Sequence, residues 1–153
     1  MIHYRNATRG KGVDSNKLKS TARDLLLAAG EEESSLSLSL VGDREIRKLN
    51  RLHRGKDSAT DVLSFPLLSD EDPHLSGGGE RLLGDVVISV ETAQRQAGAY
   101  DAALQDELYR LLIHGILHVL GHDHEEAGER ARMEREERRL AAAIAMPWPY
   151  EPA

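Results

Sequence analysis

Residues 104–124 read LQDELYRLLIHGILHVLGHDH, and this stretch decides the fold because it predicts a long helix with one apolar face. Its leucines recur every three or four positions, which is the spacing of side chains on one side of an α-helix. A helix with such a face must bury it, so we expect this helix to cover a small sheet. Gly121 is expected to end the helix, because glycine can adopt the left-handed conformation that reverses the chain.

Three histidines in this stretch have the spacing of metal ligands. His114 and His118 are four residues apart, so on a helix they share one face and can bind one ion together. The turn at Gly121 can bring His124 back as a third ligand. Three neutral imidazoles leave a zinc ion with an open fourth position, as in catalytic rather than structural sites. A single histidine is more often packed or solvated, but three at this spacing predict a catalytic metal site, with zinc as the expected ion.

The remaining histidines are interpreted differently. His3, His53 and His74 are expected to be ordinary surface residues. His122 stands beside Asp123, whose carboxylate can accept a ring N–H from a liganding histidine or cap the turn through the backbone. Of these two roles for Asp123, capping is favoured.

Position 115 separates this sequence from the zinc peptidases with the motif H-E-x-x-H-x-x-G-x-x-H. Those enzymes use the glutamate after the first histidine as the general base, whereas this chain has Gly115 there. Glycine cannot accept a proton from an attacking water. The metal site of the three histidines therefore serves another reaction, or the general base comes from another part of the chain. On this reasoning, Gly115→Glu should still bind metal and should gain at most traces of peptidase activity.

Three segments resemble the signatures of the bacterial YbeY family. They are HGILHVLGHDH at 114–124, RGKDSATDVLSFP at 54–66 and LGDVVIS at 83–89. The resemblance implies a single-strand-specific, metal-dependent endoribonuclease that acts in 16S rRNA 3′-end maturation and ribosome quality control. It further implies zinc ligands at His114, His118 and His124, a functional role for Arg54, and RNA and the small ribosomal subunit as partners. No DNA partner is expected.

A basic segment at residues 44–56 overlaps the start of the motif at 54–66. Ile46, Leu49 and Leu52 supply the apolar stripe of a predicted helix, and a solvated helix face accounts for most of the charges. Arg54 differs, because Gly55 should end the helix there and a guanidinium at a helix end can hold two phosphate oxygens. We therefore predict a catalytic role for Arg54. The basic residues are Arg44, Arg47, Lys48, Arg51, Arg54 and Lys56.

Composition limits the classes of protein that remain. The chain has 153 residues, no cysteine and a formal net charge of −6. Such a chain is long enough for one domain, which we place at residues 1–145, followed by a proline-rich tail at 146–153. The absence of cysteine and of long apolar runs predicts a cytoplasmic protein with no membrane partner. A negative net charge means that any contact with RNA must be local.

The remaining patterns predict an α/β (α+β) fold with a small mixed sheet of about four strands. The strand near Asp85 is expected to be central, because it carries no charge after that residue. Asp101 can cap the metal helix, and residues 69–80 are interpreted as a tolerated insertion or a lid. Strand order and direction are left open. The expected strands are 35–41, 61–65 and 85–90, and the further helices are 14–30, 43–54, 91–99 and 125–145.

Two alternative functions remain at this point. One is a metallopeptidase with a relocated base, which would cleave unstructured protein. The other is a ribosome-assembly factor whose zinc is mainly structural, which would keep its function in a variant that binds metal but cannot cleave RNA.

Overall fold

Among the residues that the structure describes, a mixed sheet of four strands organises the fold. The computed structural model describes residues 1–8, 12–67, 81–122 and 126–148. The strand order is β1-β2-β4-β3, with β1, β2 and β4 parallel and β3 antiparallel to β4. This arrangement confirms the mixed sheet and the central position of the strand at Asp85. The strands are β1 (Ile2–Asn6), β2 (Ser34–Val41), β3 (Val62–Pro66) and β4 (Arg81–Ser89).

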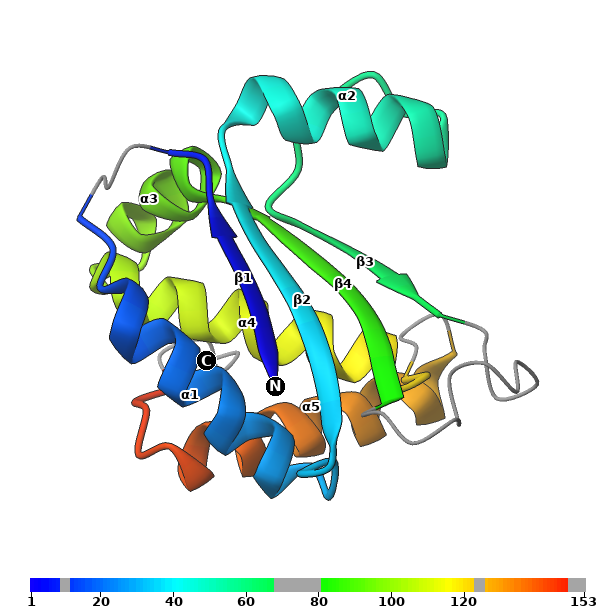
Figure 1. Ribbon diagram of the computed structural model, residues 1–153. Helices are drawn as coiled ribbons and strands as arrows, with labels where there is room; N and C mark the ends of the chain where they lie inside the picture. The colour runs from blue at the N-terminus through cyan, green and yellow to red at the C-terminus, as the bar shows by residue number, and fades with distance from the viewer. Residues whose placement is uncertain (9–11, 68–80, 123–125, 149–153) are drawn as a thin grey trace.

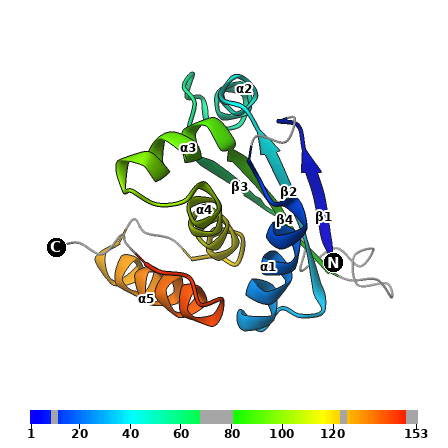
Figure 2. The same ribbon diagram turned by 90° about the vertical axis from the view of Figure 1, so that its left-hand side faces the viewer.

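In the described part of the chain, five helices pack around this sheet. In Figures 1 and 2, α1 and α4 lie against one face with α5 beyond them, while α2 lies on the opposite side. Within the described residues, no helix is long and apolar enough to cross a membrane. The helices are α1 (Ser15–Ala28), α2 (Asp43–Arg54), α3 (Val90–Ala99), α4 (Leu104–Val119) and α5 (Ala127–Ala143).

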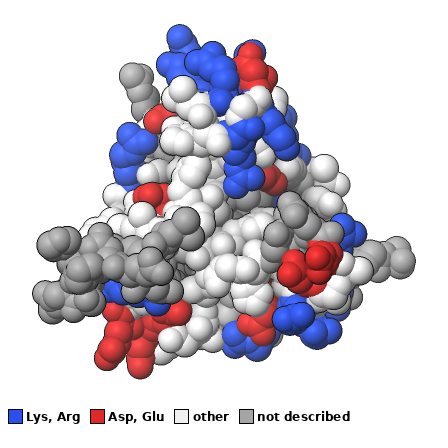
Figure 3. Space-filling view, turned by 90° about the vertical axis from the view of Figure 1, so that its right-hand side faces the viewer, with Lys and Arg blue, Asp and Glu red and all other residues white. Residues whose placement is uncertain are grey.

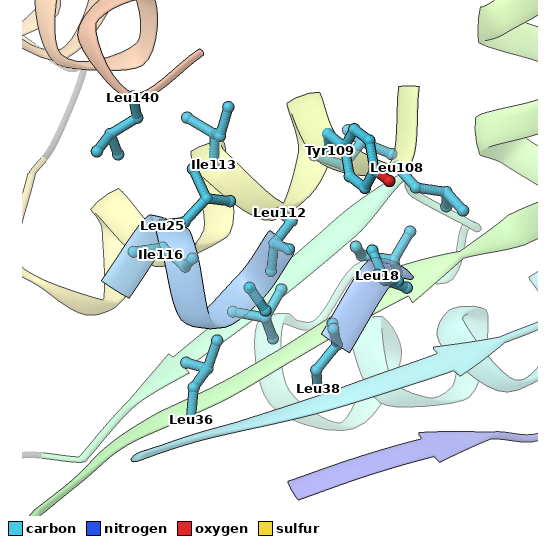
Figure 4. Packing of buried hydrophobic residues seen from close by; sticks show 14 of the residues in the cluster. Leu18, Leu25, Leu36, Leu38, Leu108, Tyr109, Leu112, Ile113, Ile116 and Leu140 are labelled. Atoms are coloured by element: carbon cyan, nitrogen blue, oxygen red, sulfur yellow. The ribbon is translucent and has the colours of Figure 1, made fainter. Parts of the chain in front are cut away.

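The main core lies between the sheet and the helices α1 and α4. Alternate side chains of a strand point to opposite faces, so the leucines of β2 all face these two helices. Figure 4 shows them packed among the leucines and isoleucines of α1 and α4. Burial of each such side chain contributes roughly 1.5–3 kcal/mol relative to an exposed one. The residues include Leu36, Leu38, Leu18, Leu25, Leu108, Leu112 and Ile116.

A smaller core lies on the other face of the sheet, beneath α2. Ile46 packs there with Val41, Leu63 and Val87, and Leu49 is partly buried against them. Leu52 does not join them, since it is 71% exposed. The predicted apolar stripe of α2 is therefore shorter than expected, because the helix extends past the edge of the surface that it covers.

Two local features differ from the sequence expectations. β1 was not among the expected strands, because its charged and polar residues give no apolar run; the strand pairs with β2 at the sheet edge. Asp101 does not cap α4. It adopts a positive φ of 54° in the preceding turn, and Ala103 occupies the N-cap position without a side-chain hydrogen bond.

Gly84 shows how closely β3 and β4 approach. Its φ is 155°, and a Cβ there would lie 2.4 Å from the carbonyl oxygen of Phe65. Only glycine fits such a backbone position. The register between β2 and β4 also shifts here, between Ser35 and Ser37.

The last described residues pack against the main core. Met146 is buried and Trp148 is partly buried there.

Candidate metal centre

Two histidines approach each other on the side of α4 that reaches solvent. His114 and His118 are half-buried, whereas residues 115–117 between them are buried. Their Nε2 atoms lie 3.0 Å apart, and their rings are inclined at 73°. Zinc binds imidazole nitrogen at about 2.0–2.1 Å, so a tetrahedral ion holds two such nitrogens roughly 3.3 Å apart. The two side chains therefore fit a shared metal ion with little movement.

The third predicted ligand, His124, lies outside the described residues, as does Asp123. Their predicted roles therefore stay predictions. Within the described residues 1–8, 12–67, 81–122 and 126–148, no group of three histidine, aspartate or glutamate side chains could hold a metal ion. Any third ligand must therefore come from a residue outside these ranges or from a rearranged side chain.

The turn that leads toward His124 is described. Gly121 has a φ of 98°, and its N–H donates to the carbonyl oxygen of His118 at 3.0 Å. The N–H of His122 donates to the carbonyl oxygen of Leu117 at 2.9 Å. These bonds satisfy carbonyl groups at the end of α4, in the pattern common after helices that end at glycine. The prediction that Gly121 ends the helix is confirmed.

A carboxylate lies on the far side of the His114 ring. Glu137 Oε2 is 3.7 Å from Nδ1 of His114, and the Glu137 side chain is only 12% exposed. The neighbouring Glu136 is engaged elsewhere, since Arg139 donates to it and holds its pKa below the usual value. Glu137 is thus an α5 carboxylate that lies beside His114. Sequence reasoning missed it, because residues 125–145 show only interleaved charges and no local signal marks one glutamate.

An open cavity of about 280 Å³ adjoins the turn after α4. It is lined by Leu120, Gly121 and His122 from the turn and by Glu129 and Arg132 from α5. The cavity leaves solvent-accessible space beside the turn that precedes His124. A catalytic metal needs such an opening for water or substrate, whereas a structural site is closed.

Gly115 faces the sheet rather than the histidine pair. A Cβ at this position would lie 2.6 Å from Val86 Cγ1 and 3.2 Å from Ser64 Oγ. The Ser64 hydroxyl also donates to the Gly115 carbonyl oxygen at 3.3 Å. Glycine therefore allows α4 to lie close against β3 and β4. The missing glutamate of the peptidase motif has a packing reason that the sequence pattern did not reveal.

Arg54 occupies the end of α2, as expected. Gly55 follows in the left-handed conformation, with a φ of 69°, and the Arg54 side chain is exposed. The structure does not bring Arg54 into contact with His114 or His118, because α2 packs on the opposite face of the sheet. The C-terminal ends of α2 and α4 nevertheless point toward the same side of the molecule, with edge strand β3 between them (Figure 1).

The histidines that were expected at the surface lie there where the structure describes them. His3 and His53 are exposed, and the His53 ring meets Phe65 edge-on with 5.0 Å between centroids. The predictions for these two are confirmed. His74 lies outside the described residues.

Comparison with known proteins identifies relatives across most of the chain. The family described as Endoribonuclease YbeY matches residues 3–145. A protein of that name from Anaeromyxobacter sp. (strain Fw109-5) is 50% identical over 135 residues, 88% of this chain and 67% of the relative. Another from Moorella thermoacetica is 44% identical over 141 residues, 88% of this chain and 90% of the relative.

A solved structure supports the fold independently. The solution structure of a Thermotoga maritima protein matches with a TM-score of 0.60 and covers 99% of this chain and 97% of that chain. Its sequence identity is 23%, so this likeness bears on the fold alone.

Proposed function

The chain belongs to the YbeY family, and from this membership we propose that it is a metal-dependent endoribonuclease that hydrolyses single-stranded RNA. The names of the curated relatives support a hydrolase that acts on RNA. The observation that carries the proposal is the approach of His114 Nε2 to His118 Nε2 at 3.0 Å. His124 is proposed as the third ligand.

Each residue of the site has a distinct proposed task. The Nε2 atoms of His114 and His118 lie 3.0 Å apart, and we propose that both bind one metal ion through their lone pairs. Glu137, whose Oε2 lies 3.7 Å from His114 Nδ1, is proposed to attract the Nδ1–H of His114, which would favour the tautomer with a free Nε2 and orient the ring. When bound, a zinc ion supplies an acidic water or polarises a phosphate oxygen. Arg54 stabilises negative charge on the phosphate with its planar guanidinium group.

The proposed substrate and partner follow from the family. We propose that the RNA is ribosomal, that the protein acts in 16S rRNA 3′-end maturation and ribosome quality control, and that it meets the small ribosomal subunit. Depletion of the protein should then lead to accumulation of 16S rRNA with an unprocessed 3′ end. Normal 3′ ends after depletion would contradict this assignment.

One experiment tests the reaction class. The purified protein is analysed for bound metal and is then incubated with single-stranded RNA and with casein. We expect about one zinc per chain, cleavage of RNA that a chelator abolishes, and no proteolysis above a metal-free control. Robust proteolysis would favour the peptidase alternative. Zinc without RNA cleavage would favour an assembly factor with a mainly structural metal.

Arg54→Ala should lower RNA cleavage at least about tenfold, or ~1.4 kcal/mol of transition-state stabilisation. Bound metal and thermal stability should not change, because the side chain is exposed at the end of α2. Arg54→Lys should fall between alanine and the parent, since lysine restores the charge without the two-pronged hydrogen bonding. Single-turnover cleavage measures this, with Arg23→Ala on α1 as control. If Arg54→Ala cleaves RNA at the parental rate, Arg54 has no role in catalysis and is part of a solvated helix face.

Glu137→Gln should weaken zinc binding by about tenfold, because residues that orient metal ligands typically contribute 10–100-fold to affinity. Competition with a chromogenic chelator measures the affinity without relying on enzyme activity. Glu134→Gln is the control, since Glu134 is an exposed glutamate on the same helix. An equal loss of zinc affinity in both variants would mean that Glu137 acts only through its negative charge and does not orient His114.

A further inference from the structure

One face of α2 concentrates positive charge on a protein that is negative as a whole. The spacing of these cations is i, i+3, i+4 and i+7, which places them on one side of the helix. Together with Asp57 they line an open pocket of about 300 Å³. We call these four residues the cationic face of α2; they are Arg44, Arg47, Lys48 and Arg51, and all are exposed.

The acidic residues of α2 do not neutralise this face. Asp43 accepts hydrogen bonds from Ser89, Thr92 and Arg95. Burial opposes ionisation of Asp43, but these hydrogen bonds outweigh it and hold its pKa below the usual value. Glu45 pairs with Arg5 of β1 at 3.1 Å. Both carboxylates are thus held by groups outside the cationic face.

Asp57 contributes a single negative charge against the four cations. It accepts two hydrogen bonds from Arg47, at 2.9 and 3.2 Å, and this lowers its pKa. Among the residues that the structure describes, Arg44 and Lys48 have no ion-pair partner. The face therefore keeps excess positive charge, although the chain carries a formal net charge of −6.

The position of α2 relates this face to the histidine pair. Edge strand β3 separates α2 from α4, and both helices end on the same side of the molecule (Figure 1). In Figure 3, which looks at that side, Lys and Arg gather at the top of the view, and much of the surface below them carries no charge. An extended ligand that crosses the β3 edge can therefore contact α2 and still reach the side of the molecule toward which α4 points.

We propose that the cationic face of α2 binds phosphate groups of single-stranded RNA outside the cleavage site. The inference rests on the proposed function for the choice of RNA, but it assigns a separate surface. Lysine and arginine bind phosphates without reading base sequence, and arginine can hold two phosphate oxygens at once. The face would anchor one segment of the substrate while another segment lies at the histidines.

The test measures RNA binding in the His118→Ala background, where binding does not depend on cleavage. Fluorescence anisotropy with a labelled single-stranded RNA gives the dissociation constant at several salt concentrations. Arg44→Glu/Lys48→Glu should weaken binding at least tenfold near 0.1 M salt. The slope of log affinity against log salt should decrease by about 1.4, since each lost phosphate contact on a single strand removes about 0.7.

The control changes the same total charge elsewhere. Lys17→Glu/Arg23→Glu replaces two exposed cations on α1 and should leave affinity within about twofold of the parent and the slope unchanged. An equal loss in both double variants would mean that net charge alone matters, and unchanged binding in both would mean a solvated helix face. Either result overturns the proposal. A third result would also overturn it: Arg44→Glu/Lys48→Glu keeps RNA binding but loses binding of a polyglutamate peptide. That result would indicate an acidic protein partner. Thermal unfolding checks that each variant is folded.

Discussion

His118→Ala is expected to reduce zinc affinity by more than about 100-fold and RNA cleavage to the level of a metal-free control. The reason is geometric, because the Nε2 atoms of His114 and His118 lie 3.0 Å apart and are proposed to bind the same ion. Without His118, the ion loses one of these two ligands. Loss of a group that only orients a metal ligand lowers metal affinity by up to about 100-fold. Loss of the ligand itself should lower the affinity further. Metal analysis after dialysis and cleavage of single-stranded RNA measure the two effects. His114→Ala and His124→Ala should behave alike.

A matched histidine separates this effect from general loss of an imidazole. His3→Ala removes an exposed histidine of β1 and should leave zinc binding and cleavage unchanged. Stability is compared in the presence of chelator, because bound metal by itself stabilises the folded state. Full zinc occupancy in the alanine variants of all three proposed ligands would eliminate this site.

Gly115→Ala should destabilise the protein by about 1–2 kcal/mol. Overpacking in a core typically costs about 1–3 kcal/mol, and the better helix propensity of alanine returns up to about 1 kcal/mol. The added Cβ would lie 2.6 Å from Val86 Cγ1, and this β-branched side chain is itself fully buried. Chemical denaturation measures the loss. The control Gly98→Ala has open space around the new Cβ and should be neutral or stabilising.

This contact also changes the expectation for Gly115→Glu. The sequence pattern alone predicts a metal-binding variant with traces of peptidase activity. In the structure, a glutamate at 115 would meet the sheet at Val86 and Ser64. It would bury a carboxylate without a charged partner, at a cost of roughly 3–5 kcal/mol. We therefore expect Gly115→Glu to fold poorly and to lose metal for that reason. A stable, zinc-loaded Gly115→Glu protein would contradict this packing argument.

The sequence by itself determined the features that depend on neighbouring residues. The leucine spacing of residues 104–120 predicted α4, and the four-residue interval placed His114 and His118 on one side of it. Gly121 and Gly55 marked helix ends because both adopt left-handed backbone conformations that favour glycine. Three motifs also predicted the family that the comparisons identify. Each of these features follows from hydrogen bonding or spacing within a few residues.

Only the tertiary structure decided which distant segments meet. It placed Glu137 of α5 beside His114, Gly115 against Val86 and α2 on the face of the sheet opposite α4. It also added β1 to the sheet, where pairing with β2 compensates for a strand without a strong apolar pattern. Such contacts depend on how all the helices and strands pack together, and local periodicity does not encode the direction in which one helix face meets another.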